Sequence, residues 1–160
     1  MKKTNSHEKF MRLAISKALQ GVKNGQTPFG ACIVKNGKVV SLAHNGVWKN
    51  TDITAHAEMN AIRTACRKLK TVDLSGCVIY STCEPCPMCF SACHWARISR
   101  IVFGAGIADA KKAGFNELIM GNAMMKKLSR GKVKIVAGVM KKENLRLFHL
   151  WSSGRNKRPY

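Results

Sequence analysis

Three residues of this 160-residue sequence have the side chains and spacing of metal ligands. Cys86 and Cys89 form a C-x-x-C pair at the expected start of a helix, and His56 precedes them in the chain. The unpaired N–H groups of a first helical turn favour the thiolate form of cysteine, which is the form that binds metals. Two thiolates and one imidazole suit zinc. Three protein ligands are typical of a catalytic zinc site, which keeps one position for water, whereas a structural site is normally closed by four.

Two further cysteines could supply a fourth ligand. Cys83 forms a second C-x-x-C with Cys86, and Cys93 lies on the same helical face as Cys89. The proline before Cys86 and the helix expected after it favour Cys86 and Cys89 as the ligand pair. We expect Cys93 to pack in the core. The remaining thiols lie in apolar patterns and are expected to be buried: Cys32, Cys66 and Cys77.

A carboxylate, Glu58, follows the histidine ligand at a spacing that suits proton transfer. It lies two residues after His56, where a helix is expected to begin. From there it can reach the open coordination position without binding the metal itself. It could then act as general base toward a water held there and return the proton to a leaving amine. His-x-Glu followed by Pro-Cys-x-x-Cys is the signature of zinc-dependent nucleobase deaminases.

Two segments around these residues carry a family resemblance. Thr54–Met59 reads TAHAEM, and Glu84–Cys89 reads EPCPMC. Together they resemble the motifs of the cytidine and deoxycytidylate deaminase superfamily, and the likeness extends over residues 8–150. The resemblance implies a homodimer and an α/β fold of three layers, in which a mixed five-stranded sheet lies between helices.

The resemblance also implies the roles of the residues in the two motifs. Glu58 would carry the proton. The zinc ligands would be His56, Cys86 and Cys89. No cofactor besides Zn²⁺ is implied.

Other segments resemble the guanine deaminase branch of this superfamily. They are Pro28–Ala31, Trp95–Arg97, Ala113–Phe115 followed by Glu117, and the terminal Tyr160. This branch implies hydrolytic loss of the 2-amino group of guanine, which gives xanthine and ammonia. A small purine base is therefore the expected partner of the site.

Three residues receive roles in substrate binding from this likeness, and each has a plainer alternative. Asn45 would contact the purine, although a turn residue is the alternative. Glu117 would take part in catalysis, through substrate binding or proton transfer, although an acid near a helix start is often a cap. Tyr160 would close the site from its own or a partner subunit, although chain ends are often poorly ordered.

The walls of the substrate site follow from the same resemblance. Backbone N–H groups near Ala57 and Cys86 would hold the base. Phe29 could stack on a flat base and Trp95 could line the pocket, and core packing is the alternative for both aromatic residues.

A rival interpretation is the bacterial tRNA adenosine deaminase branch, which shares the zinc motifs. Ile98–Gly104 is at least as similar to that branch. Against it, the chain has Phe29 where those enzymes usually have valine, and it has Asp52-Ile53 where they usually have Asp-Pro. A cytosine or cytidine deaminase is a third option. A non-catalytic zinc-stabilised RNA-binding module is a fourth, against which Glu58 argues, because a structural site has no use for an uncoordinated carboxylate.

The elements that must position these residues alternate along the chain. Asn36-Gly37 between two apolar runs predicts a hairpin. Helical spacing and buried runs predict helices over 6–25, 56–69, 87–95, 117–127 and 143–151, and strands over 30–35, 38–43, 77–81, 101–103 and 133–137. This pattern predicts an α/β domain with a mixed five-stranded sheet. Residues 1–160 are expected to form one domain, with residues 141–160 as a candidate cap of the active site.

The charge of the chain is unusual for its size. Lys and Arg number 28 against 8 acids, for a formal net charge of +20. The excess is +7 in residues 1–55, +2 in 56–110 and +11 in 111–160. The excess in the last third could be background or could bind RNA phosphates beside the site. No apolar run predicts a membrane span or a secretory signal, and the odd count of 7 cysteines is typical of intracellular thiols, so we expect a cytoplasmic protein.

Overall fold

A five-stranded sheet forms the centre of the computed structural model, which describes residues 3–155 and 157–160. The strand order is β2-β1-β3-β4-β5. β1 pairs antiparallel with β2 and β3, whereas β3, β4 and β5 run parallel, so the sheet is mixed as expected. The strands are β1 Gly30–Lys35, β2 Lys38–His44, β3 Cys77–Cys83, β4 Arg100–Ala105 and β5 Lys134–Val136.

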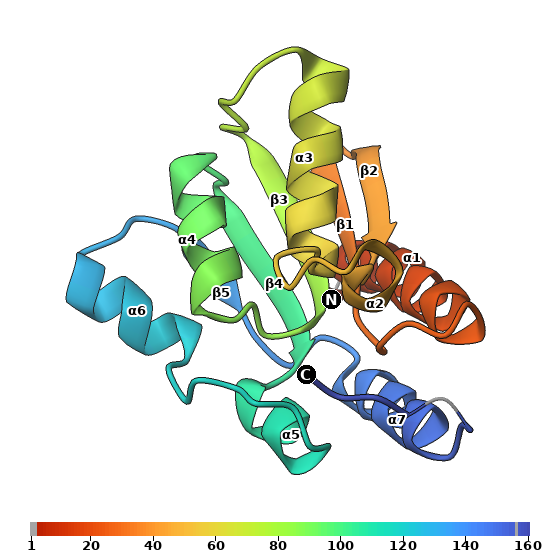
Figure 1. Ribbon diagram of the computed structural model, residues 1–160. Coiled ribbons are helices and arrows are strands. Elements are labelled where there is room, and N and C mark those ends of the chain that lie inside the picture. Colours follow the sequence, from red (N-terminus) through yellow and green to blue (C-terminus); the bar gives the residue numbers. More distant parts are fainter. Residues whose placement is uncertain (1–2, 156) are drawn as a thin grey trace.

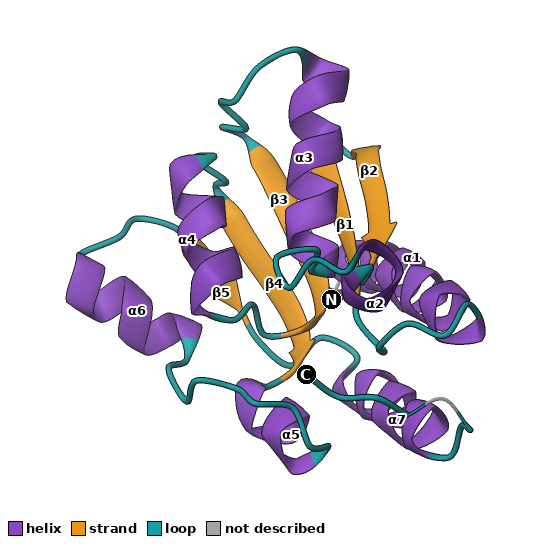
Figure 2. Ribbon diagram, in the orientation of Figure 1, coloured by secondary structure: helices purple, strands orange, loops and turns teal. Residues whose placement is uncertain are grey.

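Helices cover both faces of the sheet and give the three expected layers (Figures 1 and 2). One face packs against α1 (Lys3–Lys23) and α7 (Lys141–Ser152), and the other against α3 (Ala57–Leu69) and α4 (Pro87–Trp95). Three shorter helices lie around the sheet: α2 (Val47–Asn50), α5 (Ile107–Lys112) and α6 (Asn122–Ser129). No helix among the described residues has the length and apolar character needed to cross a bilayer.

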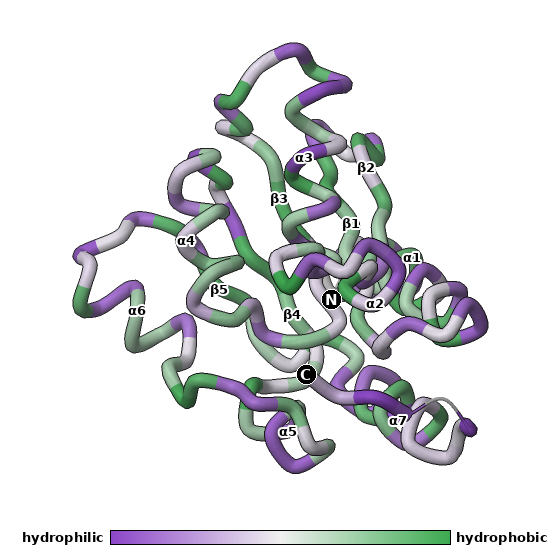
Figure 3. The backbone as a smooth tube through the Cα atoms, viewed as in Figure 1, coloured by the Kyte–Doolittle hydropathy of each residue, from purple (hydrophilic) through white to green (hydrophobic). Residues whose placement is uncertain are grey.

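The central strands are apolar on both sides because both sides are covered (Figure 3). On β1, Cys32 and Val34 belong to the apolar cluster under α1. Ala31 and Ile33 alternate with them and belong to the larger cluster on the opposite side. Successive side chains of the strand therefore contribute alternately to the cores on the two sides of the sheet.

The hairpin predicted at Asn36-Gly37 is present. Both residues have positive φ angles, 49° and 74°. Positive φ at both central positions defines a type I′ turn, whose twist matches that of the flanking strands. The turn therefore joins β1 to β2 at the sheet edge, as the sequence predicts.

The helix predicted over 117–127 is partly wrong. Residues 115–121 form an irregular segment, and α6 begins only at Asn122. Leu118 and Ile119 are each 69% exposed, so the apolar spacing there does not mark a core-facing helix. The short helices α2 and α5 were not predicted, because neither is long enough to show a period. The other predicted elements are all present, with ends that differ by at most three residues.

A second feature of the fold is a groove lined with cations, here called the cationic groove. It has a volume of about 590 Å³ and lies where the end of α4 meets the segment from α6 to β5. Its lining includes four cations, Arg97, Arg130, Lys132 and Lys134, and also His94. Arg97 is paired with Asp73, whose carboxylate lies 3.1 Å from the guanidinium. The groove therefore contains part of the positive charge excess of residues 111–160.

Candidate active site

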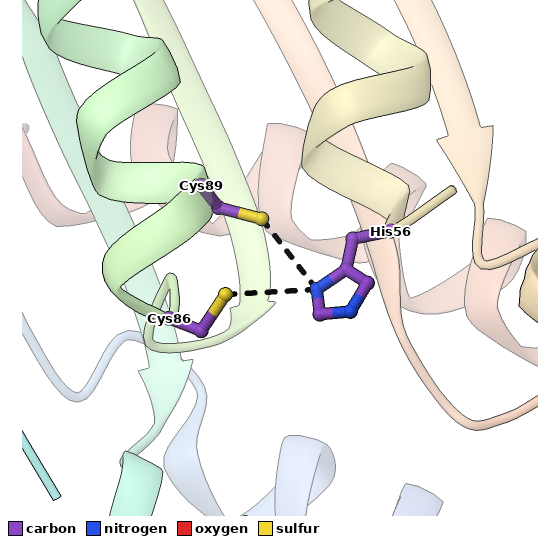
Figure 4. Close-up of side chains that lie close together, drawn as sticks. All are labelled: His56, Cys86 and Cys89. Atoms are coloured by element: carbon purple, nitrogen blue, oxygen red, sulfur yellow. Dashed lines mark hydrogen bonds between the residues drawn. The ribbon is translucent and has the colours of Figure 1, made fainter. Parts of the chain in front are cut away.

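The ends of two helices bring the predicted metal ligands together (Figure 4). His56 immediately precedes α3, and Cys86 immediately precedes α4, with Cys89 in its first turn. The Nδ1 atom of His56 lies 3.7 Å from the sulfur of Cys86 and 3.6 Å from that of Cys89. Because α3 and α4 pack side by side on one face of the sheet, two motifs that are distant in the chain share one point.

The spacing of these donor atoms fits a tetrahedral zinc ion. Typical Zn–N and Zn–S bond lengths place the nitrogen and a sulfur of such a site about 3.6 Å apart. The observed separations of 3.6 and 3.7 Å match this value. Among the described residues, the cluster contains His56, Cys86 and Cys89 and no fourth ligand.

The two competing cysteines lie elsewhere, as the sequence predicts. The Cys83 thiol donates to the carbonyl oxygen of Gly106 at 3.5 Å. Cys93 is buried in the larger apolar cluster. A site with three protein ligands keeps one coordination position for water, which is the catalytic arrangement.

Hydrogen bonds among the two ligand thiols and the histidine shift the pKa values of all three groups. A hydrogen bond from the Cys89 thiol lowers the pKa of Cys86 to about 4, against the effect of burial, and His56 contributes in the same direction. The same hydrogen bond and burial raise the pKa of Cys89. Burial alone would lower the pKa of His56, but its hydrogen bond with Cys86 raises it. One thiolate is thus already favoured, and a bound cation favours the second.

Glu58 lies beside the ligands and belongs to the first turn of α3. It is only 5% exposed. One carboxylate oxygen accepts a hydrogen bond from the Ser81 hydroxyl at 2.9 Å, and the other lies 3.7 Å from the Cys89 sulfur. Burial raises the pKa of this carboxyl group, although the charge on His56 opposes the shift. A carboxylate with a raised pKa next to an open metal position is suited to take up and release a proton.

Ser81 was not predicted from the sequence. It lies on β3 and faces α3, on the same side of the strand as Ile79 and Cys83. A polar residue on the inward face of an otherwise apolar strand is the signal that could have identified it, because a buried hydroxyl needs a partner.

A cavity of about 260 Å³ opens in front of the ligand cluster. His56 and Cys86 form its floor, and much of its wall is apolar, from Ile53, Met88 and Leu118. None of the residues that line it is Lys or Arg. An adjoining smaller hollow reaches Glu58. The apolar wall residues were not predicted, because nothing in a single sequence marks exposed apolar residues as neighbours.

Asn45 and Tyr160 meet at this site although 115 residues separate them in the chain. The Asn45 amide nitrogen donates to the Tyr160 hydroxyl at 2.5 Å, and the Asn45 side-chain oxygen accepts from the Val47 N–H at 3.0 Å. The Tyr160 ring lies 5.5 Å from the His56 ring, and the Tyr160 carbonyl accepts from the Asn116 N–H at 3.0 Å. The end of the chain is therefore held over the cluster. Within residues 141–160, α7 packs on the sheet, and Tyr160 is the residue that lines the cavity.

Glu117 lines both the cavity and the smaller hollow. It lies in the irregular segment before α6 and not at a helix start, so it caps no helix. Burial raises its pKa to about 7, and the negative charge of Cys86 contributes to the rise. Its position and this pKa fit the predicted part in substrate binding or proton transfer.

The remaining predicted residues differ in their positions. Phe29 lines the smaller hollow and packs edge-on against Phe115, at a ring distance of 4.8 Å, so it belongs to both site wall and core. Ala57 is fully buried as the first residue of α3. Trp95 is 82% exposed, so both predictions for it were wrong. It lies at the far end of the 9-residue helix α4, about 13 Å along the helix axis from the ligand turn.

Comparisons with known proteins agree with this geometry. A family model described as the cytidine and deoxycytidylate deaminase zinc-binding region matches residues 4–105. Guanine deaminase of Bacillus subtilis (strain 168) is 38% identical over 156 residues, which cover 97% of this chain and 99% of that protein. The tRNA-specific adenosine deaminase of Aquifex aeolicus (strain VF5) is 46% identical over 107 residues, which cover 67% of this chain and 70% of that protein.

A similar solved structure comes from a study of guanine deaminase from Nitrosomonas europaea. It superposes with a TM-score of 0.85 at 25% sequence identity, and the match covers 92% of this chain and 85% of that chain. The match covers most of the chain, so the fold expected from the resemblance is present.

Proposed function

The chain belongs to the cytidine and deoxycytidylate deaminase family, and on this basis we propose that it is a zinc-dependent hydrolase that converts guanine and water to xanthine and ammonia. The observation that carries the proposal is the pairing of a three-ligand cluster with an uncoordinated, buried carboxylate. His56, Cys86 and Cys89 supply the donors, and Glu58 lies against Cys89 without belonging to the cluster. A structural metal site would use a fourth ligand and would need no such carboxylate.

Glu58 would perform the proton transfers of this reaction. A bound zinc ion supplies an activated water as nucleophile at neutral pH. Glu58 would take a proton from that water as the C2–O bond forms and pass it to the ring nitrogen N3, while Ser81 holds its carboxylate in place. It would then take the second proton from the new C2 hydroxyl group and pass it to the departing amine as the C2–N bond breaks. Its raised pKa suits both uptake and delivery, because the carboxyl group must take up and release a proton in each of the two transfers.

The size and lining of the cavity support a free base as substrate. At about 260 Å³ the cavity is smaller than the clefts that take drug-sized ligands. Its apolar wall suits the faces of a flat ring, and the Glu117 carboxyl group offers a polar partner for the ring edge. Asn45 lines neither hollow, and its amide instead holds the Tyr160 hydroxyl in place. The likeness to guanine deaminase extends over the C-terminal third, which carries both Glu117 and Tyr160.

A tRNA adenosine deaminase is the second candidate. The identity of 46% to such an enzyme and the net charge of +20 favour it. The position of the charge argues against it, because the cationic groove lies at the opposite end of α4 from the ligands. No lysine or arginine lines the cavity in which the reacting base would lie.

A direct assay separates the two candidates. Purified zinc-loaded protein is incubated with guanine and, in parallel, with an anticodon stem-loop RNA that carries adenosine, and the release of ammonia and inosine is measured. We expect ammonia from guanine and no inosine in the RNA. Turnover of the RNA alone would overturn the proposed substrate.

The remaining features of the proposal concern assembly and place in the cell. We place the protein in the cytoplasm as a homodimer, in keeping with its family and its seven free cysteines. We treat residues 1–160 as one deaminase domain whose C-terminal residue closes the cavity.

A further inference from the structure

Glu84, immediately before the Pro-Cys-x-x-Cys turn, makes an unusual set of contacts. One of its carboxylate oxygens accepts a hydrogen bond from the Ile107 N–H at 3.2 Å. The other accepts from the Asn122 N–H at 2.7 Å. Ile107 and Asn122 are the first residues of α5 and α6, so one carboxylate binds the N-termini of two different helices.

This carboxylate takes the place of a side-chain cap at both helices. The residues that precede them are Gly106 and Gly121, which have no side chain to satisfy the first N–H groups. A Cβ atom on Gly121 would lie 3.2 Å from one Glu84 oxygen, and a Cβ atom on Gly106 would lie 3.7 Å from the other. Gly121 thus leaves room for the carboxylate, and the negative charge suits both helix N-termini.

The segment between the two helices forms one side of the cavity. It contains Asn116, Glu117 and Leu118, all of which line the cavity. The same segment is irregular, and beyond Phe115 its backbone N–H groups make one hydrogen bond to the Tyr160 carbonyl and two short-range bonds within the segment. The helices at its two ends therefore contribute to its position.

A second contact joins this segment to the ligand turn. Asn122 is fully buried, and its side-chain amide donates to the carbonyl oxygen of Pro85 at 2.6 Å. Glu84 and Pro85 directly precede Cys86. The residue that follows this segment, Asn122, and the start of helix α5, which leads into it, are thereby attached to the residues next to a metal ligand.

We propose that Glu84 is a positioning residue of the active site, which fixes the distance between the ligand turn and the wall that carries Glu117. This inference rests on the proposed deaminase function. Each Glu84 oxygen accepts a hydrogen bond from the first backbone N–H group of a helix, so the residue acts through the helices.

The test uses the near-isosteric variant Glu84→Gln, in which the amide nitrogen can no longer accept one of the two N–H groups. Its matched control is Glu143→Gln, which removes an acid from the first turn of α7, far from the cavity wall. Hydrogen exchange of residues 107–122, zinc content and kcat for guanine are measured for both variants. We expect faster exchange in residues 107–122 and a fall in kcat of about tenfold to a hundredfold for Glu84→Gln, with zinc content retained. Unchanged exchange, or a kcat within twofold of that of the control, would overturn the proposal.

A second pair of variants tests the same contact without changing Glu84. Gly121→Ala places a methyl group at 3.2 Å from the carboxylate and must displace it, whereas Gly106→Ala makes an ordinary contact at 3.7 Å. We expect Gly121→Ala to speed hydrogen exchange of residues 107–122 less than Glu84→Gln does, and Gly106→Ala to exchange like the unchanged protein. Equal exchange rates in the two glycine variants would count against the role of Glu84. The exchange measurements need no substrate, so they remain informative even if the protein does not deaminate guanine.

Discussion

The two ends of helix α4 use charge in opposite ways. At its N-terminus, Cys86 and Cys89 lie next to two carboxyl groups, Glu58 and Glu117, and no lysine or arginine lines the cavity. At its C-terminus, the cationic groove has four lysines or arginines among its lining residues. About 13 Å of helix separates the two regions.

This contrast shows that the net charge of +20 is a poor guide to the chemistry of the site. In the cavity, burial raises the pKa of both carboxyl groups, so the protein environment controls their charge. In the groove, the cations are exposed to water. Because exposed charges are screened over about 8 Å at physiological ionic strength, the groove has little influence on the cavity.

The substitution Glu58→Gln tests the cavity and has the largest expected effect. The amide keeps the shape and the hydrogen bond from Ser81 but cannot take up a proton. We expect deamination of guanine to slow by about 10²- to 10⁴-fold, the usual contribution of a general acid–base group. Ammonia release and bound zinc are measured together, and zinc content should be unchanged. Glu8→Gln on the exposed face of α1 serves as control, and full activity of Glu58→Gln would refute the mechanism.

The groove is tested by removing three of its cations together, Arg130→Ala, Lys132→Ala and Lys134→Ala. We expect kcat/KM for guanine to stay within about twofold, since these charges are screened from the cavity. Binding to heparin should weaken, and the slope of log affinity against log salt should fall by about one for each cation.

A triple variant of equal charge gives the control for the groove. Lys9→Ala, Lys23→Ala and Lys38→Ala remove three exposed cations from other surfaces. If both triple variants lose heparin affinity equally, the groove is no special site for anions. If the groove variant loses deaminase activity tenfold, the two ends of α4 are coupled after all.

The smallest effect is expected from Asp73→Asn, which removes the carboxylate paired with Arg97 of the groove. Hydrogen bonds from Ser75, together with Arg97, lower the pKa of Asp73. A lowered pKa in the folded state means that the carboxylate stabilises the protein above the ordinary aspartate pKa, and that this contribution is lost as the pH falls through the folded value. We expect the variant to melt about 2 °C or less below the unchanged protein at pH 7.

Two measurements check this prediction. Melting curves of the two proteins should converge below about pH 4, where the aspartate is protonated in the unfolded chain. Heparin should retain Asp73→Asn slightly more strongly than Glu8→Gln, which changes the net charge equally but removes the partner of Arg12 on α1. Equal retention would show that Asp73 does not moderate the charge of the groove.

The sequence predicted the elements of the fold well where the pattern was long or local. The hairpin at Asn36-Gly37 follows from the φ preferences of two adjacent residues. The segment 117–127 misled the prediction, because its apolar residues lie on an exposed wall and follow helical spacing without packing as a helix. Trp95 misled the prediction as well. It is near Cys89 in the sequence, but it lies at the far end of helix α4.

By itself, the sequence determined which residues are available for chemistry, the candidate ligands His56, Cys86 and Cys89 and the carboxylate of Glu58. His56 and Cys86 each immediately precede a helix, and Glu58 and Cys89 lie in the first turns of those helices, so local geometry places each pair at one helix start. Only the tertiary structure decided what surrounds that chemistry. Asn45 meets Tyr160, and Glu84 meets Ile107 and Asn122, through contacts between residues far apart in the chain. Such contacts depend on how helices and strands pack in three dimensions, which no spacing within one segment encodes.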